Sequence, residues 1–211
     1  MAILEDIAIS VEKGDETSVG ELTQKAITEG IEATEILNKG LVAGMNVVGE
    51  KFKNNEVFIP EVLVSARAMK AGMKQVRPLL AEANIKSKGK IVVGTVKGDL
   101  HDIGKNIVGM LLEGAGFEVT DLGTDVSKEE FMDVVEKEGI DVIGMSALLT
   151  TTMTYMKEII QAVNDANLKD KVKVIIGGAP ITQSYADEIK ADGYAPDAAS
   201  AVDLVKSLLN S

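Results

Sequence analysis

The second half of the chain alternates short apolar runs with helical stretches, and this alternation constrains the fold more than any other feature. The runs are rich in β-branched residues and read as strands over 90–96, 117–122, 140–145, 172–176 and 193–195. Helical spacing follows each of them, near 104–114, 127–138, 151–166, 182–190 and 200–210. Strands that alternate with helices form parallel βαβ units. Five such units favour a flavodoxin-like (Rossmann-like) α/β domain with a five-stranded parallel sheet over a full dinucleotide-binding fold.

The first half has a helical period throughout. Apolar residues recur at helical spacing in four segments, and the breaks between them fall near Asp15, Gly30 and Asn54-Asn55. Four helices joined by short connections predict an all-α four-helix bundle. Pro60 suits the first turn of the fourth helix, whereas Pro78 lies inside that helix and is expected to kink or shorten it.

A linker is predicted over residues 84–89, where the helical pattern stops and the first strand has not begun. We therefore expect an N-terminal helical domain over 1–88 and a second domain over 89–211. Acidic charge is concentrated in the second domain: 13 acidic and 11 basic residues give −2 over 1–88, and 20 acidic and 11 basic residues give −9 over 89–211. Ser127 and Glu130 form a capping box for the helix near 127–138.

Composition excludes several classes of function. The chain has no cysteine, which rules out disulfides, zinc fingers, iron–sulfur clusters and thiolate catalysis. A net charge of −11 disfavours binding to nucleic acid and to anionic membranes, and seven aromatic residues (3 Tyr and 4 Phe) offer few platforms for base stacking. The chain has no basic leader and no apolar run long enough to span a bilayer. We expect a cytoplasmic protein with neither nucleic-acid nor membrane partners.

The loops after the strands are the expected place for chemistry, because ligands of such sheets bind beyond the carboxyl ends of the strands. The first loop runs from Gly98 to Asn106 and contains His101, the only histidine of the chain. It is not a phosphate-binding loop, since five residues separate Gly98 from Gly104-Lys105 and Asn106 replaces the Ser or Thr that would hold magnesium. No strand is followed by the glycine pattern of dinucleotide-binding proteins.

A single imidazole can serve as a metal ligand when its second ring nitrogen is also engaged. Its second ring nitrogen needs a partner that fixes the tautomer, and Asp99 is suitably placed two residues earlier. Ser146 or Thr152, from a neighbouring strand end, could in turn hold that carboxylate. One protein ligand cannot retain a bare metal ion, but it can supply an axial ligand to a metal already held by a macrocycle.

Three motifs together resemble a known family. Asp99-x-His101-x-x-Gly104, Ser146-x-Leu148 and Gly177-Gly178 match the cobalamin-binding domains of the methionine synthase type in order and in position at strand ends. This resemblance covers residues 89–211, and residues 1–88 resemble the four-helix cap domain that precedes it. The whole chain resembles the stand-alone corrinoid proteins of anaerobic methyltransferase systems.

The resemblance implies a cofactor and a set of residues that bind it. Cobalamin or a related corrinoid would bind with its own base displaced from cobalt and with His101 as the lower axial ligand. His101, Asp99 and Ser146 would carry the catalytic roles, and Thr152 would take the second hydroxyl position of the relay. The implied cofactor-binding residues are Gly98, Asp99, Leu100, His101, Asp102, Ile103, Gly104, Ser146, Leu148, Thr150, Thr152, Gly177, Gly178, Tyr194 and Ala195.

The resemblance also implies a function. Cobalt(I) would accept a methyl group from a substrate-specific methyltransferase, and methylcobalt(III) would donate it to a second methyltransferase that uses tetrahydrofolate or coenzyme M. A reductive-activation protein would be a further partner. The chain would thus be the corrinoid-carrying component of a methyltransferase system and not a complete enzyme alone.

Other functions fit parts of the pattern. A cobalamin-binding subunit of an adenosylcobalamin-dependent mutase shares the Asp-x-His-x-x-Gly motif, but small subunits of that kind resemble residues 89–211 alone. A cobalamin-dependent light sensor would need a DNA-binding module and a second histidine. A receiver-like domain, with Asp99 as its phosphorylation site, would leave the three motifs unexplained.

The same residues also have purely structural interpretations. A lone histidine often serves a structural role, and Asp99 suits an N-cap, although Asp102 fits that position better. Thr152 could cap the helix predicted from 151, and Gly177-Gly178 could form a tight turn. Met45, Met69 and Met73 read as core residues, with an apolar cover over the methyl-bearing face of the cofactor as the alternative.

Overall fold

The computed structural model describes residues 2–83 and 87–209, and it divides into two compact units. The first comprises residues 1–88 with 110–116, and the second comprises residues 89–109 with 117–211. The linker predicted over 84–89 lies partly outside the described residues, as does the predicted end of the last helix at residue 210.

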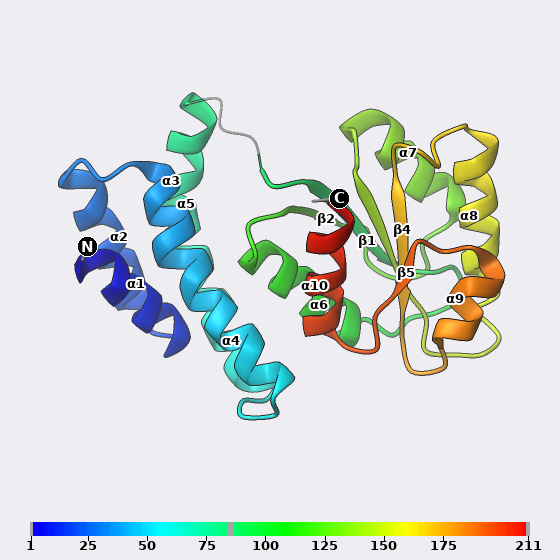
Figure 1. Cartoon of the computed structure of the whole chain (residues 1–211), viewed down its shortest axis with the longest axis horizontal. Coiled ribbons are helices and arrows are strands. Elements are labelled where there is room, and N and C mark those ends of the chain that lie inside the picture. Colours follow the sequence, from blue (N-terminus) through cyan, green and yellow to red (C-terminus); the bar gives the residue numbers. More distant parts are fainter. Residues whose placement is uncertain (1, 84–86, 210–211) are drawn as a thin grey trace. The chain divides into compact units, whose positions relative to one another are not determined.

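A five-stranded parallel sheet forms the centre of the second unit, as the alternating pattern predicts (Figure 1). Its strands are β1 (Lys90–Thr95), β2 (Glu118–Asp121), β3 (Val142–Ser146), β4 (Lys173–Gly177) and β5 (Gly193–Tyr194). Their spatial order is β2-β1-β3-β4-β5, which is the flavodoxin-like order. The predicted fold class is confirmed.

Helices cover both faces of this sheet (Figure 1). They are α6 (Ile103–Gly114), α7 (Lys128–Glu138), α8 (Tyr155–Asp165), α9 (Gln183–Ile189) and α10 (Ala198–Leu209). The helices α7, α8 and α9 lie on one face, and α6 and α10 lie on the other. The predicted capping box at α7 is present, because Ser127 and Glu130 each bond the backbone of the other.

The packing of the sheet depends on one close approach. Phe131 of α7 is fully buried, and a Cβ atom added to Gly94, the last residue but one of β1, would lie 2.6 Å from its ring. The absent side chain of Gly94 therefore makes room for the aromatic ring that fills this side of the core. The same core contains Val92, Ile143 and Met156, all fully buried.

The first unit contains the four predicted helical segments. These are α1 (Ala2–Glu12), α2 (Glu16–Thr28), a third segment of α3 (Ala33–Glu35), a π-helix (Ile36–Val42) and α4 (Ala43–Lys53), and finally α5 (Ile59–Glu82). The third segment packs closely on α1, since a Cβ added to Gly44 would lie 2.5 Å from the carbonyl oxygen of Ala8. Pro78 does not shorten α5, which runs on to Glu82.

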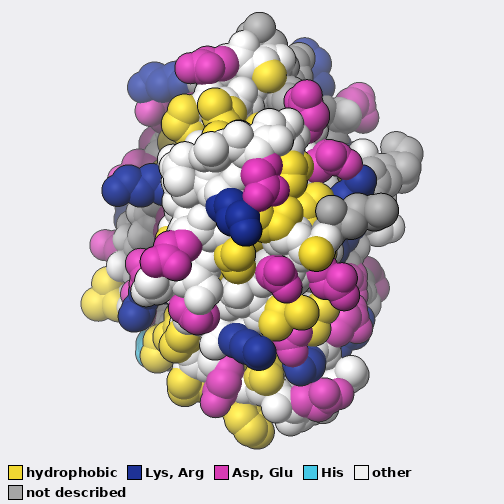
Figure 2. Space-filling model, turned by 90° about the vertical axis from the view of Figure 1, so that its left-hand side faces the viewer, with side chains coloured by type: hydrophobic (Ala, Val, Ile, Leu, Met, Phe, Trp, Pro, Cys, Tyr) yellow, Lys and Arg dark blue, Asp and Glu magenta, His cyan; other side chains and the backbone are white. Residues whose placement is uncertain are grey.

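Most large apolar side chains of the helical unit are buried in its core, and a few are exposed at its surface. Met45 and Met69 are buried, as expected of core residues, whereas Met73 is half-buried. The alternative role of these methionines as an apolar cover over a cofactor stays a prediction. Figure 2 shows side chains of both charge signs interspersed with apolar ones on the left-hand face of Figure 1. The exposed large apolar side chains of this unit are Ile9, Val47, Phe58, Ile59 and Val64. Among the residues described, no helix combines the length and the apolar character that a membrane span requires.

Candidate functional site

The site lies where β1 and β3, two adjacent strands, reach their carboxyl ends. Thr95 and Ser146 are paired in register, so the loop after β1 and the loop after β3 begin side by side. Ser146 is in turn paired with Gly177 on β4, and Ile176 with Tyr194 on β5. The predicted motifs are therefore brought to one edge of the sheet, as the parallel topology requires.

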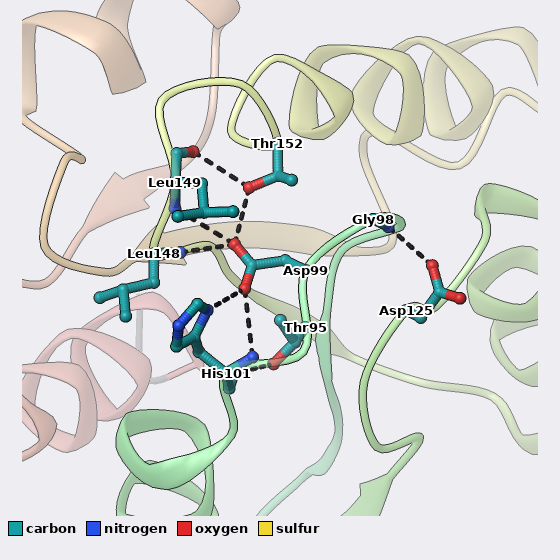
Figure 3. A network of polar contacts seen from close by, with 8 residues as sticks. All are labelled: Thr95, Gly98, Asp99, His101, Asp125, Leu148, Leu149 and Thr152. Carbon is teal, nitrogen blue, oxygen red and sulfur yellow. Dashed lines mark hydrogen bonds and ion pairs between the residues drawn. The ribbon is translucent and has the colours of Figure 1, made fainter.

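Asp99 is at the centre of a polar network drawn in Figure 3. Its side chain is fully buried and accepts hydrogen bonds at both oxygens. Oδ1 accepts from Nδ1 of His101 at 2.7 Å and from the His101 amide at 3.1 Å. Oδ2 accepts from Thr152 Oγ1 at 2.6 Å and from the amides of Leu148 and Leu149 at 2.8 and 3.2 Å. Five donors thus converge on one carboxylate.

These donors decide the charge of Asp99. Burial by itself raises the pKa of the carboxyl group, but the hydrogen bonds from Thr152, His101 and the Leu148 amide lower it by more. The pKa is consequently held well below its usual range, and Asp99 is ionised at neutral pH. An ionised carboxylate only accepts hydrogen bonds, so Nδ1 of His101 carries the ring proton.

Asp99 therefore orients the imidazole of His101 through Nδ1, and Nε2 remains available to a ligand. Its side chain is 51% exposed. Within the part of the chain that the structure describes, Nδ1 contacts Asp99 and Nε2 has no hydrogen-bond partner. A neutral imidazole with Nδ1 protonated presents a lone pair at Nε2, which is the form that binds a metal.

The hydroxyl that completes the relay comes from Thr152. Both Ser146 and Thr152 are candidates from sequence, but the structure places Thr152, and not Ser146, on the Asp99 carboxylate. Residues 150–154 form turns, and α8 begins only at Tyr155, so Thr152 does not sit in the helix predicted from 151. This turn directs the Thr152 hydroxyl towards Asp99 and lets it contact the Leu149 carbonyl at 3.0 Å as well.

Two residues that sequence reasoning missed hold the His101 loop from outside it (Figure 3). Thr95 Oγ1, at the end of β1, donates to the His101 carbonyl at 2.8 Å. Asp125 has a positive φ of 58°, and its carboxylate accepts from the Gly98 amide at 2.7 Å. Its own amide donates to the Asp99 carbonyl at 3.0 Å. A threonine that reads as a strand former and an aspartate in a loop gave no local signal of these contacts.

The start of α6 is fixed by a buried cation. Lys105 is buried, and its Nζ lies 2.5 and 2.6 Å from the two carboxylate oxygens of Asp121 at the end of β2. It also donates to Asn106 Oδ1 at 2.7 Å. Lys105 is thus occupied within the fold, in agreement with the rejection of a phosphate-binding loop. Asp102 precedes α6 and accepts from the Asn106 side chain at 3.0 Å.

Exposed apolar side chains surround His101. Leu100 is 73% exposed and Ile103 is 68% exposed, and Leu148 and Leu149 are also exposed. Apolar side chains left open around one polar ligand are typical of a binding surface. Of these four residues, Leu149 was not predicted. Gly104 and Thr150 are exposed at the same edge, with nothing within 4 Å of a Cβ added to Gly104.

The two glycines at and directly after the end of β4 are required by close packing of the backbone. Gly178 has a φ of +127°, and a Cβ there would lie 1.9 Å from the carbonyl oxygen of Ala147. A Cβ on Gly177 would lie 3.1 Å from the carbonyl oxygen of Ala195. Both glycines therefore permit the strand ends to approach each other. Ala195 is buried and Tyr194 is half-buried beside them.

The donor set decides what kind of metal the site can take. No group of three or more His, Asp or Glu side chains that could hold an ion occurs among residues 2–83 and 87–209. A single free imidazole nitrogen within an apolar surround does not retain a bare ion. It does fit a metal held by a macrocycle, which needs one axial ligand and an apolar surface for its ring.

Comparisons with known proteins agree along the whole chain. A sequence profile of the B12 binding domain matches residues 89–203, and a second profile with the same description matches residues 3–77. A corrinoid protein of Desulfitobacterium hafniense (strain Y51) is 46% identical over 212 residues, covering 99% of this chain and 98% of that protein. The dimethylamine corrinoid protein of Methanosarcina barkeri is 45% identical over 208 residues, covering 98% of this chain and 97% of that protein.

A solved structure is similar over the same length. The methanol:cobalamin methyltransferase complex MtaBC from Methanosarcina barkeri contains a chain that matches with a TM-score of 0.90 and 33% identity. The match covers 100% of this chain and 80% of that one.

Proposed function

Because this chain belongs to the family of corrinoid proteins with a B12 binding domain, we propose that it carries a methyl group between two methyltransferases. A bound corrinoid supplies the cobalt centre to which the methyl group is attached and from which it is removed. The protein supplies the axial ligand, the apolar surround and the contacts to partners. We further propose that residues 1–88 act as the cap domain and residues 89–211 as the cobalamin-binding domain.

His101 is the proposed lower axial ligand, with the base of the cofactor displaced. The observation that carries this assignment is the free Nε2 of a ring whose Nδ1 is held at 2.7 Å by a fully buried carboxylate. Asp99 fixes the tautomer and makes the ring a stronger donor, and Thr152 keeps the carboxylate in place. Ser146, which does not contact Asp99, remains a prediction as a residue that lines the cofactor.

The remaining predicted residues have separate proposed roles. Leu100, Ile103 and Leu148 offer the apolar surface for the ring, and Leu149 joins them. The nucleotide tail is proposed to pass the strand ends at Ser146, Thr150, Gly177, Gly178, Tyr194 and Ala195. Gly98, Asp102 and Gly104 belong to the loop that presents His101.

The relatives suggest the class of methyl donor. One similar protein is named as a dimethylamine corrinoid protein, and the similar solved structure is of a methanol:cobalamin methyltransferase complex. Methylated amines and methanol are therefore the methyl donors to test first. We propose a substrate-specific methyltransferase as one partner, and a methyltransferase that uses tetrahydrofolate or coenzyme M as the other. The mutase alternative loses support because full-length relatives that include the helical unit are corrinoid proteins.

Electron paramagnetic resonance tests the axial ligand directly. The full chain would be labelled with nitrogen-15 histidine, loaded with cobalamin and reduced to cobalt(II). Since His101 is the only histidine, a nitrogen-15 doublet splitting identifies it as the ligand. A nitrogen-14 triplet would show that the base of the cofactor stays bound, and failure to retain cobalamin would contradict the family-based proposal as a whole. His101→Gln is the matched control, in which the doublet is expected to disappear.

A further inference from the structure

A single hydroxyl group connects the end of β1 to the backbone of His101. Thr95 is the last residue of β1, and its side chain is fully buried. Its Oγ1 donates to the carbonyl oxygen of His101 at 2.8 Å (Figure 3). Burying a hydroxyl costs free energy unless it is hydrogen-bonded, and valine would fill the same space without that cost. The contact with His101 is what satisfies the hydroxyl at this position.

Thr95 is itself held rigidly. Its amide donates to the Gly123 carbonyl at 3.0 Å, and its carbonyl accepts from the Val126 amide at 2.9 Å. On its other side it is paired in register with Ser146 of β3. The hydroxyl of Thr95 is therefore a fixed point from which the loop can be positioned.

Within the part of the chain that the structure describes, the other hydrogen bonds of His101 all lead to one group. Its amide nitrogen and its Nδ1 both donate to Oδ1 of Asp99. Both bonds end on the same oxygen atom, so Asp99 holds the ring and the amide of His101 but not its carbonyl group. Among the described residues, Thr95 donates the one hydrogen bond that holds His101 at a second, separate point, its carbonyl oxygen.

We propose that Thr95 is a positioning residue for His101, which holds the histidine backbone so that Nε2 stays presented as an axial ligand. This inference rests on the proposed function, in which His101 binds cobalt. Thr95 does not touch the cofactor in this proposal and acts only through His101. Asp125 differs from it, because it bonds the backbone of Gly98 and Asp99 and leaves His101 untouched.

The test compares threonine variants that differ in one group. Thr95→Val removes the hydroxyl and keeps the shape, Thr95→Ser keeps the hydroxyl, and Thr95→Ala removes the hydroxyl if valine distorts the strand end. Thr23→Val is the matched control, since Thr23 is equally buried but its hydroxyl has no hydrogen-bond partner among the described residues. Each full-length variant would be labelled with nitrogen-15 histidine and loaded with cobalamin.

The first readout is the ratio of His101-bound to His101-free cobalt(II) in the resonance spectrum. A net hydrogen bond of typical strength predicts that Thr95→Val lowers this ratio about fivefold. Thr95→Ser is expected to restore the ratio to within about twofold, and Thr23→Val is expected to leave it unchanged. A ratio in Thr95→Val equal to that of the original chain would overturn the proposal, as would a loss of the same size in Thr95→Ser.

The second readout needs no cofactor. In the cofactor-free chain, the ring resonances of the sole histidine report on its mobility and its tautomer. We expect broadened or displaced ring signals in Thr95→Val and original signals in Thr95→Ser. Unchanged signals in Thr95→Val would contradict the positioning role. If the original chain shows no doublet, the proposed axial ligation fails, whereas a doublet that Thr95→Val leaves intact rejects only the role of Thr95.

Discussion

The carboxylate of Asp99 lies 2.7 Å from Nδ1 of His101, and one oxygen of that carboxylate holds both the ring and the amide of the histidine. The other oxygen is occupied by Thr152 and by two backbone amides from the loop after β3. A charge that is buried, fully bonded and shared between two loops fixes the imidazole much more firmly than an exposed ion pair would.

Replacing Asp99 by asparagine is expected to weaken axial ligation. Asn keeps the size of the side chain but removes the charge that holds the Nδ1 proton. Partners of this kind usually contribute a factor of about 10–100 to metal binding, so we expect a loss of roughly tenfold or more in the ratio of His101-bound to His101-free cobalt(II). The resonance spectrum of the labelled protein measures this ratio. Asp133→Asn, which replaces an exposed carboxylate on α7 that pairs with Lys137, serves as the control and should retain the original ratio.

The Asp99 carboxylate also predicts how stability depends on pH. Its pKa in the folded chain lies below the ordinary value of 3.8, so the folded state favours the ionised form. The resulting stabilisation is fully present above about pH 4–5 and is lost as the pH falls through the folded pKa. Urea unfolding of the cofactor-free protein should therefore show the original chain losing its advantage over Asp99→Asn in acid. A difference that is constant from pH 7 to pH 3 would contradict this.

Thr152 and Ser146 should differ when the hydroxyl is removed. Hydrogen bonds to charged groups contribute about 1.5–3 kcal/mol, so Thr152→Val is expected to destabilise the cofactor-free chain by about 2 kcal/mol. Thr152→Ser should recover most of that loss. Ser146→Ala, which leaves the Asp99 network intact, is expected to change the free energy of unfolding by less than about 0.5 kcal/mol. Equal effects of Thr152→Val and Ser146→Ala would refute the assignment of the relay hydroxyl.

Gly178 should not tolerate a side chain. Its φ of +127° and the 1.9 Å approach of an added Cβ to the Ala147 carbonyl require movement of the backbone in Gly178→Ala. We expect a loss of about 3 kcal/mol or more in the free energy of unfolding. Gly49→Ala provides the comparison, because Gly49 lies within α4 and an added Cβ meets nothing within 4 Å. That variant should be neutral or more stable by up to about 1 kcal/mol.

The ion pair between the buried Lys105 and Asp121 should also be sensitive to substitution. Lys105→Met leaves the Asp121 carboxylate without its cation, although water can reach that partly exposed carboxylate. We expect a loss of about 1–3 kcal/mol, less than for a pair in which both groups are buried. Lys137→Met breaks an exposed pair with Asp133 and should change stability by less than about 0.5 kcal/mol. Thermal or urea unfolding of both variants makes the comparison.

Much of the fold followed from local pattern. The alternation of β-branched runs and helical stretches predicted the parallel sheet and its order, because a period of two or of 3.6 residues is a property of the chain itself. The predicted capping box at Ser127 and Glu130 was equally local. The helix predicted from 151 begins later, at Tyr155. Residues 150–154 form a turn instead, in which the Thr152 hydroxyl bonds Asp99.

Residue spacing along the chain was sufficient to identify the family, the parallel sheet and the one histidine in the loop after its first strand. The folded structure was needed to distinguish Thr152 from Ser146, to identify Thr95 behind His101, and to show that Gly178 makes room for the Ala147 carbonyl. The reason is physical. Each of these relationships joins residues on different strands or loops, and the contact depends on the register of the sheet and on the path of a turn. The spacing of residues along one segment specifies neither the register nor the path of the turn.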